Sequence, residues 1–165
     1  MSGRAPAKSR LLSQALAFPI ALALTAAPGC GGNGSSQPVS KARYEQKVQR
    51  IQEDVFAKVN PATLLLGARG GDPTHGLRAV QEASAKEAEE LGRIRPPGEI
   101  AEAHRSLVAA LRRYGTELSG VIAAVRERKL AGRELQAKLR SLPSVEAIHA
   151  ARVAITRKGY NIGPA

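Results

Sequence analysis

The feature that most constrains the fold is an apolar stripe between residues 100 and 125. Its members recur every three or four residues, so they all fall on one side of an α-helix. They are Ile100, His104, Leu107, Leu111, Tyr114, Leu118, Val121 and Val125. Only a helix that is buried along one seam needs this pattern, and other helices must cover the seam. The stripe therefore predicts a helix packed within a bundle.

Three further segments have the periodicity of amphipathic helices. The first is expected to begin at Ser40, which can act as an N-cap, and the second at the helix-initiating pair Asp72-Pro73. The last follows a turn near residues 129–132, is interrupted by Pro143, and resumes with Ser144 as the cap of its second half. Together these segments predict an all-α fold, an up-and-down bundle of about four helices.

Two irregular segments are also predicted. Pro61 and several glycines indicate a loop over residues 60–71, although its run Leu64-Leu65-Leu66 is too apolar for a free linker. This run is expected to pack back on the bundle as a short turn of helix. Near the C-terminus, Gly159 is a natural left-handed C-cap, and Tyr160 is placed to fold back onto the apolar seam.

Residues 1–29 have the features of an export signal. Basic residues without any acidic ones precede a mostly apolar run from Leu11 to Ala27. Cys30, the only cysteine, follows closely and is succeeded by the Gly/Ser-rich stretch of residues 31–36. The segment Ala27-Pro28-Gly29-Cys30 resembles a bacterial lipobox, in which the cysteine becomes the acylated first residue of the mature protein. Two or more acyl chains on one cysteine anchor a protein stably.

This interpretation divides the chain into a lipoprotein-type signal peptide (1–29), a flexible tether with acylated Cys30 (30–39) and a helical bundle domain (40–165). The predicted location is the extracytoplasmic face of the cell membrane. One alternative is an uncleaved transmembrane anchor, but the apolar run is short, rich in alanine and broken by Pro19. The other is cleavage by the ordinary signal peptidase after Ala27, which the following proline disfavours.

The charge of the predicted mature chain is moderately basic. Removal of residues 1–29 leaves 22 basic and 14 acidic residues, a net charge of +8. A nucleic-acid-binding surface would combine a basic face with stacking aromatics, and the mature aromatics are few, so no nucleic acid is expected as a partner. Many basic residues instead fall at predicted helix C-termini, where the helix dipole favours them. At the ends of a membrane-tethered bundle they could contact acidic lipid head groups or anionic wall polymers.

No catalytic constellation is apparent, because no nucleophile has an adjacent base and an orienting group. His104 interrupts the apolar seam, and two interpretations stay open for it. It is either a core-edge histidine bonded to a neighbouring helix, or a ligand-binding residue together with His149 and Glu146. Only Glu146-Ala147-Ile148-His149 fits the Glu-x-x-His motif of diiron bundles, so no metal site and no cofactor are assigned, although a haem between the two histidines stays open.

The segment from Arg95 to Leu111 contains the pattern Pro-Pro-x-x-apolar-x-x-x-His-x-x-Leu. Together with the C-terminal Lys158-Gly159-Tyr160-Asn161-Ile162-Gly163, it resembles small exported helical proteins of high-GC bacteria, the actinobacteria and their relatives. The relatives in question are uncharacterised lipoproteins, so the resemblance implies export and a helical fold but no activity. It also implies that His104 is part of a family pattern.

The sequence thus predicts a non-enzymatic, lipid-anchored helical domain that binds a partner protein or an envelope component such as an anionic polymer. The motivation is an anchor, a tether and a bundle without reactive groups. The alternative is a carrier of a small molecule, haem or metal in a pocket around His104 and His149.

Overall fold

The computed structural model describes residues 37–67 and 72–163, with only the backbone path for residues 61–67. Cys30, the predicted signal peptide and most of the predicted tether lie outside the described residues. The hydrophobic core lies within a compact unit that spans Ser35–Ala165. This unit therefore carries its own core, which is the requirement for folding independently of the N-terminal segment.

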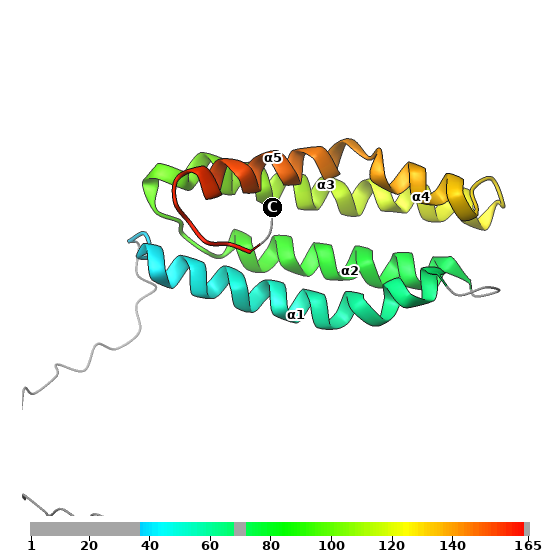
Figure 1. The fold of residues 1–165 in the computed structure, drawn as a ribbon, viewed down its shortest axis with the longest axis horizontal. Coiled ribbons are helices and arrows are strands. Elements are labelled where there is room, and N and C mark those ends of the chain that lie inside the picture. The colour runs from blue at the N-terminus through cyan, green and yellow to red at the C-terminus, as the bar shows by residue number, and fades with distance from the viewer. Residues whose placement is uncertain (1–36, 68–71, 164–165) are drawn as a thin grey trace, which may run out of the picture. The chain divides into compact units, whose positions relative to one another are not determined.

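The described residues form an all-α bundle, as the sequence predicts (Figure 1). The helices are α1 (Lys41–Gly67), α2 (Pro73–Gly92), α3 (Ala101–Arg126), α4 (Gly132–Arg140) and α5 (Pro143–Arg157), with a 3-10 turn η1 (Gly98–Ile100) before α3. α1 packs against α2, α2 against α3, and α3 against α5. The chain runs up and down, with α4 and α5 sharing the place of a fourth helix. No helix in the described part is long and apolar enough to cross a membrane.

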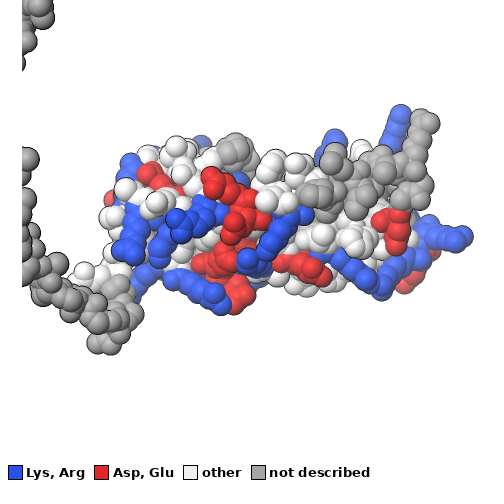
Figure 2. Space-filling view, turned by 90° about the horizontal axis from the view of Figure 1, so that it is seen from below, with Lys and Arg blue, Asp and Glu red and all other residues white. Residues whose placement is uncertain are grey.

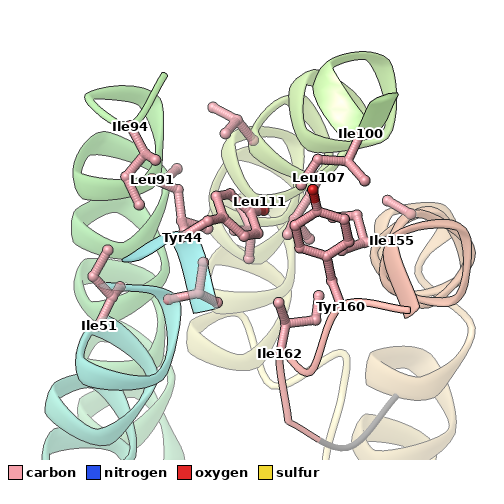
Figure 3. Close-up of a cluster of buried hydrophobic side chains, with 14 residues drawn as sticks. Tyr44, Ile51, Leu91, Ile94, Ile100, Leu107, Leu111, Ile155, Tyr160 and Ile162 are labelled. Carbon is pink, nitrogen blue, oxygen red and sulfur yellow. The ribbon is translucent and has the colours of Figure 1, made fainter. Parts of the chain in front are cut away.

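Two hydrophobic clusters fill the bundle. The first lies towards the end where α2 connects to α3, and draws on all of α1, α2, α3, α5 and the C-terminal segment; its largest fully buried members are Tyr44, Leu91, Ile100, Leu107, Ile155, Tyr160 and Ile162 (Figure 3). The second cluster consists of Leu77, Leu118, Val121, Ile122, Leu135 and Leu142. Each large aliphatic side chain buried in this way contributes about 1.5 to 3 kcal/mol. The α3 stripe is thus buried from Ile100 to Val121 except at Tyr114, and Tyr114 and Val125 are partly buried against the second cluster.

The start of α2 follows the prediction in detail. Asp72 is the N-cap and accepts a hydrogen bond from the backbone N–H of Thr74 at 2.9 Å, with Pro73 in the first turn. The same carboxylate accepts a second bond from the Thr74 hydroxyl at 2.7 Å. These bonds to the charged form lower the pKa of Asp72.

The loop prediction for residues 60–71 is wrong over its first part, because α1 continues through Pro61 to Gly67. A proline within a helix removes one backbone hydrogen bond and disturbs the preceding turn, but its φ is compatible with helical geometry. The last turns of α1 bend away from the axis of the first ones, which is the usual effect of such a proline (Figure 1). Residues 68–71 of the predicted loop lie outside the described residues.

The junction between α4 and α5 forms at Pro143, as expected, but Ser144 is not the cap. Leu142 occupies the N-cap position and Pro143 the first turn of α5. Ser144 is fully buried, and its hydroxyl donates to Glu117 Oε2 on α3 at 2.5 Å. Glu117 is also paired with Arg113 at 2.7 Å. The serine therefore ties the start of α5 to α3 instead of capping its own helix.

The C-terminal segment fills the side of the bundle between α1 and α5. Gly159 has a φ of +81°, a left-handed conformation that glycine adopts without strain, and it turns the chain back after α5. Tyr160 and Ile162 then insert between the two helices (Figure 3). The predicted fold-back of Tyr160 is confirmed by its exposed fraction of 2%.

Candidate functional site

His104 lies in the interior of the bundle, where it joins three helices. It stands on the inward face of the first turns of α3 and is 3% exposed. Its Nε2 lies 3.1 Å from the backbone oxygen of Leu91 on α2, and its Nδ1 lies 3.0 Å from the hydroxyl of Tyr44 on α1. A carbonyl only accepts hydrogen bonds, so Nε2 carries the proton and Nδ1 accepts from the Tyr44 hydroxyl. Both ring nitrogens are therefore used within the fold.

Aromatic contacts extend this cluster to the C-terminal segment. The Tyr44 ring lies edge-on to the His104 ring at 5.6 Å and edge-on to the Tyr160 ring at 5.7 Å. The Tyr160 hydroxyl donates to Glu99 at 2.5 Å, while the amine of Lys41 lies 5.3 Å from the centre of the Tyr160 ring. Burial raises the pKa of Tyr44, so this hydroxyl keeps its proton and remains a donor at physiological pH.

Burial lowers the pKa of His104, and the charge of neighbouring Arg105 lowers it further, against the opposing effect of the bond to Leu91. The folded state thus binds a proton less readily than the unfolded state, so His104 contributes stability above its unfolded pKa of about 6.5 that is lost as the pH falls below it. We expect the ring of His104 to stay neutral below pH 6.5, as followed by NMR of its ring resonances in a pH titration. A ring that is half protonated at or above pH 6.5 would contradict the buried neutral state.

The structure does not bring the predicted ligand-binding residues together. His104 faces α1 and α2 in the interior, whereas Glu146 and His149 lie exposed on α5. Within the described ranges, no group of three or more His, Cys, Asp or Glu side chains is placed to hold a metal ion. A metal or haem iron at His104 would have to displace the bond to Tyr44 or the bond to Leu91.

A hollow of about 730 Å³ opens on the outer side of His104, between α3 and the segment that connects α2 to α3. Four of its lining residues are arginines, namely Arg93, Arg95, Arg105 and Arg112, and none is acidic. The remaining lining residues are small or apolar apart from His104 itself. We call this feature the arginine hollow. Arg93 pairs with Glu89, which lies outside the wall. The excess of positive charge on the wall makes the hollow a place where an anion is favoured.

The residues that precede α1 lie against the arginine hollow. The N–H of Val39 donates to the backbone oxygen of Arg95 at 2.9 Å, which fixes the residues before α1 against the α2–α3 connection. Pro38 consequently forms part of the wall. The hollow thus lies eight residues in sequence from Cys30.

A second, smaller cavity of about 440 Å³ lies along α1, beside α2 and α5. Val55 and Val59 of α1 are only half-buried here, and Phe56 is 68% exposed. Below them, Arg152 of α5 pairs with the buried Glu87 of α2 at 3.4 Å. Burial raises the pKa of Glu87, and Arg152 opposes that rise. The lining of this cavity has two acidic residues, Glu53 and Glu87, and one basic residue, Arg152, so it lacks the positive excess of the arginine hollow.

Sequence reasoning missed the position of Arg105 and Arg112 on the wall of a hollow. Their spacing of seven residues places them on one face of α3, next to the His104 stripe, and that spacing is readable in the sequence. What the sequence does not show is that Arg93 and Arg95, which follow the end of α2, lie across from them.

Comparison of the chain with protein-family models, with curated proteins and with solved structures found no match.

Proposed function

We propose that the protein is a lipid-anchored helical domain at the extracytoplasmic face of the cell membrane, and that it binds an anionic component of the cell envelope. It acts by binding, not by catalysis. The observation that supports the binding role is the arginine hollow, with four arginines and no acidic residue on its wall. The lone Cys30, its lipobox-like context and the export-type leader support the anchor.

The predicted anchor and the arginine hollow lie close together in the sequence. The predicted anchor at Cys30 precedes Pro38, on the wall of the hollow, by eight residues, so an acylated chain would hold the hollow close to the membrane surface. Anionic lipids or envelope polymers at that surface would attract the hollow, because each basic residue near an anionic membrane surface contributes about 1 kcal/mol to attraction. Basic side chains are also visible in Figure 2 at the end of the bundle where α1 begins.

The test is fractionation of cells that produce either the full chain or its Cys30→Ala variant. We expect the full chain in the membrane fraction at any ionic strength. The variant should lose its anchor, and any part of it that stays on membranes should be released by about 0.5 M salt, because only screened electrostatic contacts remain. A Cys30→Ala variant that stays membrane-bound in high salt would contradict the lipid anchor.

A further inference from the structure

Arg105 and Arg112 are the members of the arginine hollow that nothing in the fold accounts for. Within the part of the chain that the structure describes, neither guanidinium makes a hydrogen bond or an ion pair. Arg113, adjacent in sequence, pairs with Glu117 at 2.7 Å. Arg105 and Arg112 thus differ from Arg113, a neighbour on the same helix that has an acidic partner.

Helix polarity does not explain these two positions. A positive side chain is favoured in the last turn of a helix, where the dipole is negative. Arg93 and Arg95 follow the end of α2 and fit this rule, but Arg105 lies close to the N-terminal end of α3 and Arg112 lies in its middle. Their charges therefore add to the positive potential of the hollow without stabilising their own helix.

The side chain of Arg112 extends across the hollow. Its Nη2 lies 3.5 Å from the position that a Cβ would take on Gly92, so the side chain reaches from α3 across to the end of α2. The surface between the arginines is apolar and includes Ile94 and Val108, both at 7% exposure. A ligand that fits has a compact anionic group next to a short apolar portion.

We propose that the arginine hollow is a binding site for the phosphate group of anionic phospholipid head groups, with Arg105 and Arg112 as its principal contacts. This inference rests on the proposed function, because the anchor would keep the hollow at the membrane surface. Guanidinium groups bind phosphate and carboxylate oxygens alike through two parallel hydrogen bonds, so the expected preference for a phospholipid rests on the glycerol portion beside its phosphate. The apolar patch between them accommodates the glycerol and the first methylene groups of the lipid.

The experiment measures binding of the soluble chain of residues 37–165 to vesicles in sedimentation assays. One set contains phosphatidylglycerol in phosphatidylcholine, and a second contains oleate in phosphatidylcholine at the same surface potential. The test variant is Arg105→Gln with Arg112→Gln. The matched control is Arg133→Gln with Arg140→Gln, which removes the same charge from exposed positions on α4. A third variant, Arg105→Lys with Arg112→Lys, keeps both positive charges but lacks the planar guanidinium groups.

We expect the Arg105/Arg112 glutamine variant to bind phosphatidylglycerol vesicles about tenfold more weakly than the unmodified chain, and the control variant to lose about twofold or less. The lysine variant should recover only part of the loss, and the oleate vesicles should bind the unmodified chain several-fold more weakly.

If the test and control variants lost binding to phosphatidylglycerol vesicles equally, the proposed site would be wrong. Equal binding to both vesicle types would overturn its phosphate preference. If the chain bound a soluble polyphosphate and did not bind vesicles, the ligand would be a soluble anionic polymer and the proposed lipid ligand would be wrong. None of these outcomes depends on Cys30, which is outside the soluble chain, so failure of this site and failure of the anchor are distinguishable.

Discussion

Replacement of His104 by alanine is expected to lower the free energy of unfolding by about 3 to 5 kcal/mol. The change creates a cavity and leaves two buried groups without their partner, the backbone oxygen of Leu91 and the hydroxyl of Tyr44. Each such group costs about 1 to 3 kcal/mol when it is left unsatisfied in the interior. The measurement is urea unfolding of the soluble chain of residues 37–165, followed by circular dichroism.

Two further variants help to separate the cost of the lost hydrogen bonds from the cost of the lost side-chain volume. Tyr44→Phe keeps the ring and removes only the hydroxyl, so it should cost about 1 to 2 kcal/mol. His149→Ala changes an exposed histidine on α5 and should stay within about 0.5 kcal/mol of the unmodified chain. If His104→Ala proved as stable as His149→Ala, the buried role assigned to His104 would be wrong.

Replacement of Tyr160 by alanine should also cost about 3 to 5 kcal/mol, since truncation of a buried aromatic residue removes a large packed volume. Tyr160 fills the space between α1 and α5, and its loss also removes the edge-on contact with Tyr44 and the bond to Glu99. The unfolding midpoint in urea gives the measurement.

Tyr160→Phe is the matched control for this position. It retains the ring against Tyr44 and removes only the hydroxyl that donates to Glu99, so a loss of about 1 kcal/mol is expected. A Tyr160→Ala chain with the stability of Tyr160→Phe would show that the C-terminal segment does not brace the two helices.

Local signals in the sequence were sufficient for much of the fold. The stripe on α3, the Asp72-Pro73 start and the Gly159 turn each depend on neighbours within one helical turn or one loop, and all three are confirmed. The sequence does not predict the continuation of α1 beyond residue 60, because proline and glycine usually mark the end of a helix. Ser144 was misassigned because its partner, Glu117, lies 27 residues away on α3.

The candidate site required tertiary information. The sequence left two interpretations of His104 open, and its partners are 60 residues away on α1 and 13 residues away on α2, which no local pattern reveals. The arginine hollow likewise forms only when the face of α3 lies across from the α2–α3 connection. Arg93 and Arg95 follow the helix-dipole rule and Arg105 and Arg112 do not, and only the packing of the helices brings the four onto one wall.

A lipid anchor on Cys30 is proposed to hold the anion-binding bundle at the membrane surface. The intact mass of the protein, extracted from the membranes of the cells that make it, tests for this anchor. We expect a chain that begins at Cys30 and carries two or more acyl chains on that residue. An unacylated chain that still carries residues 1–29 would contradict it.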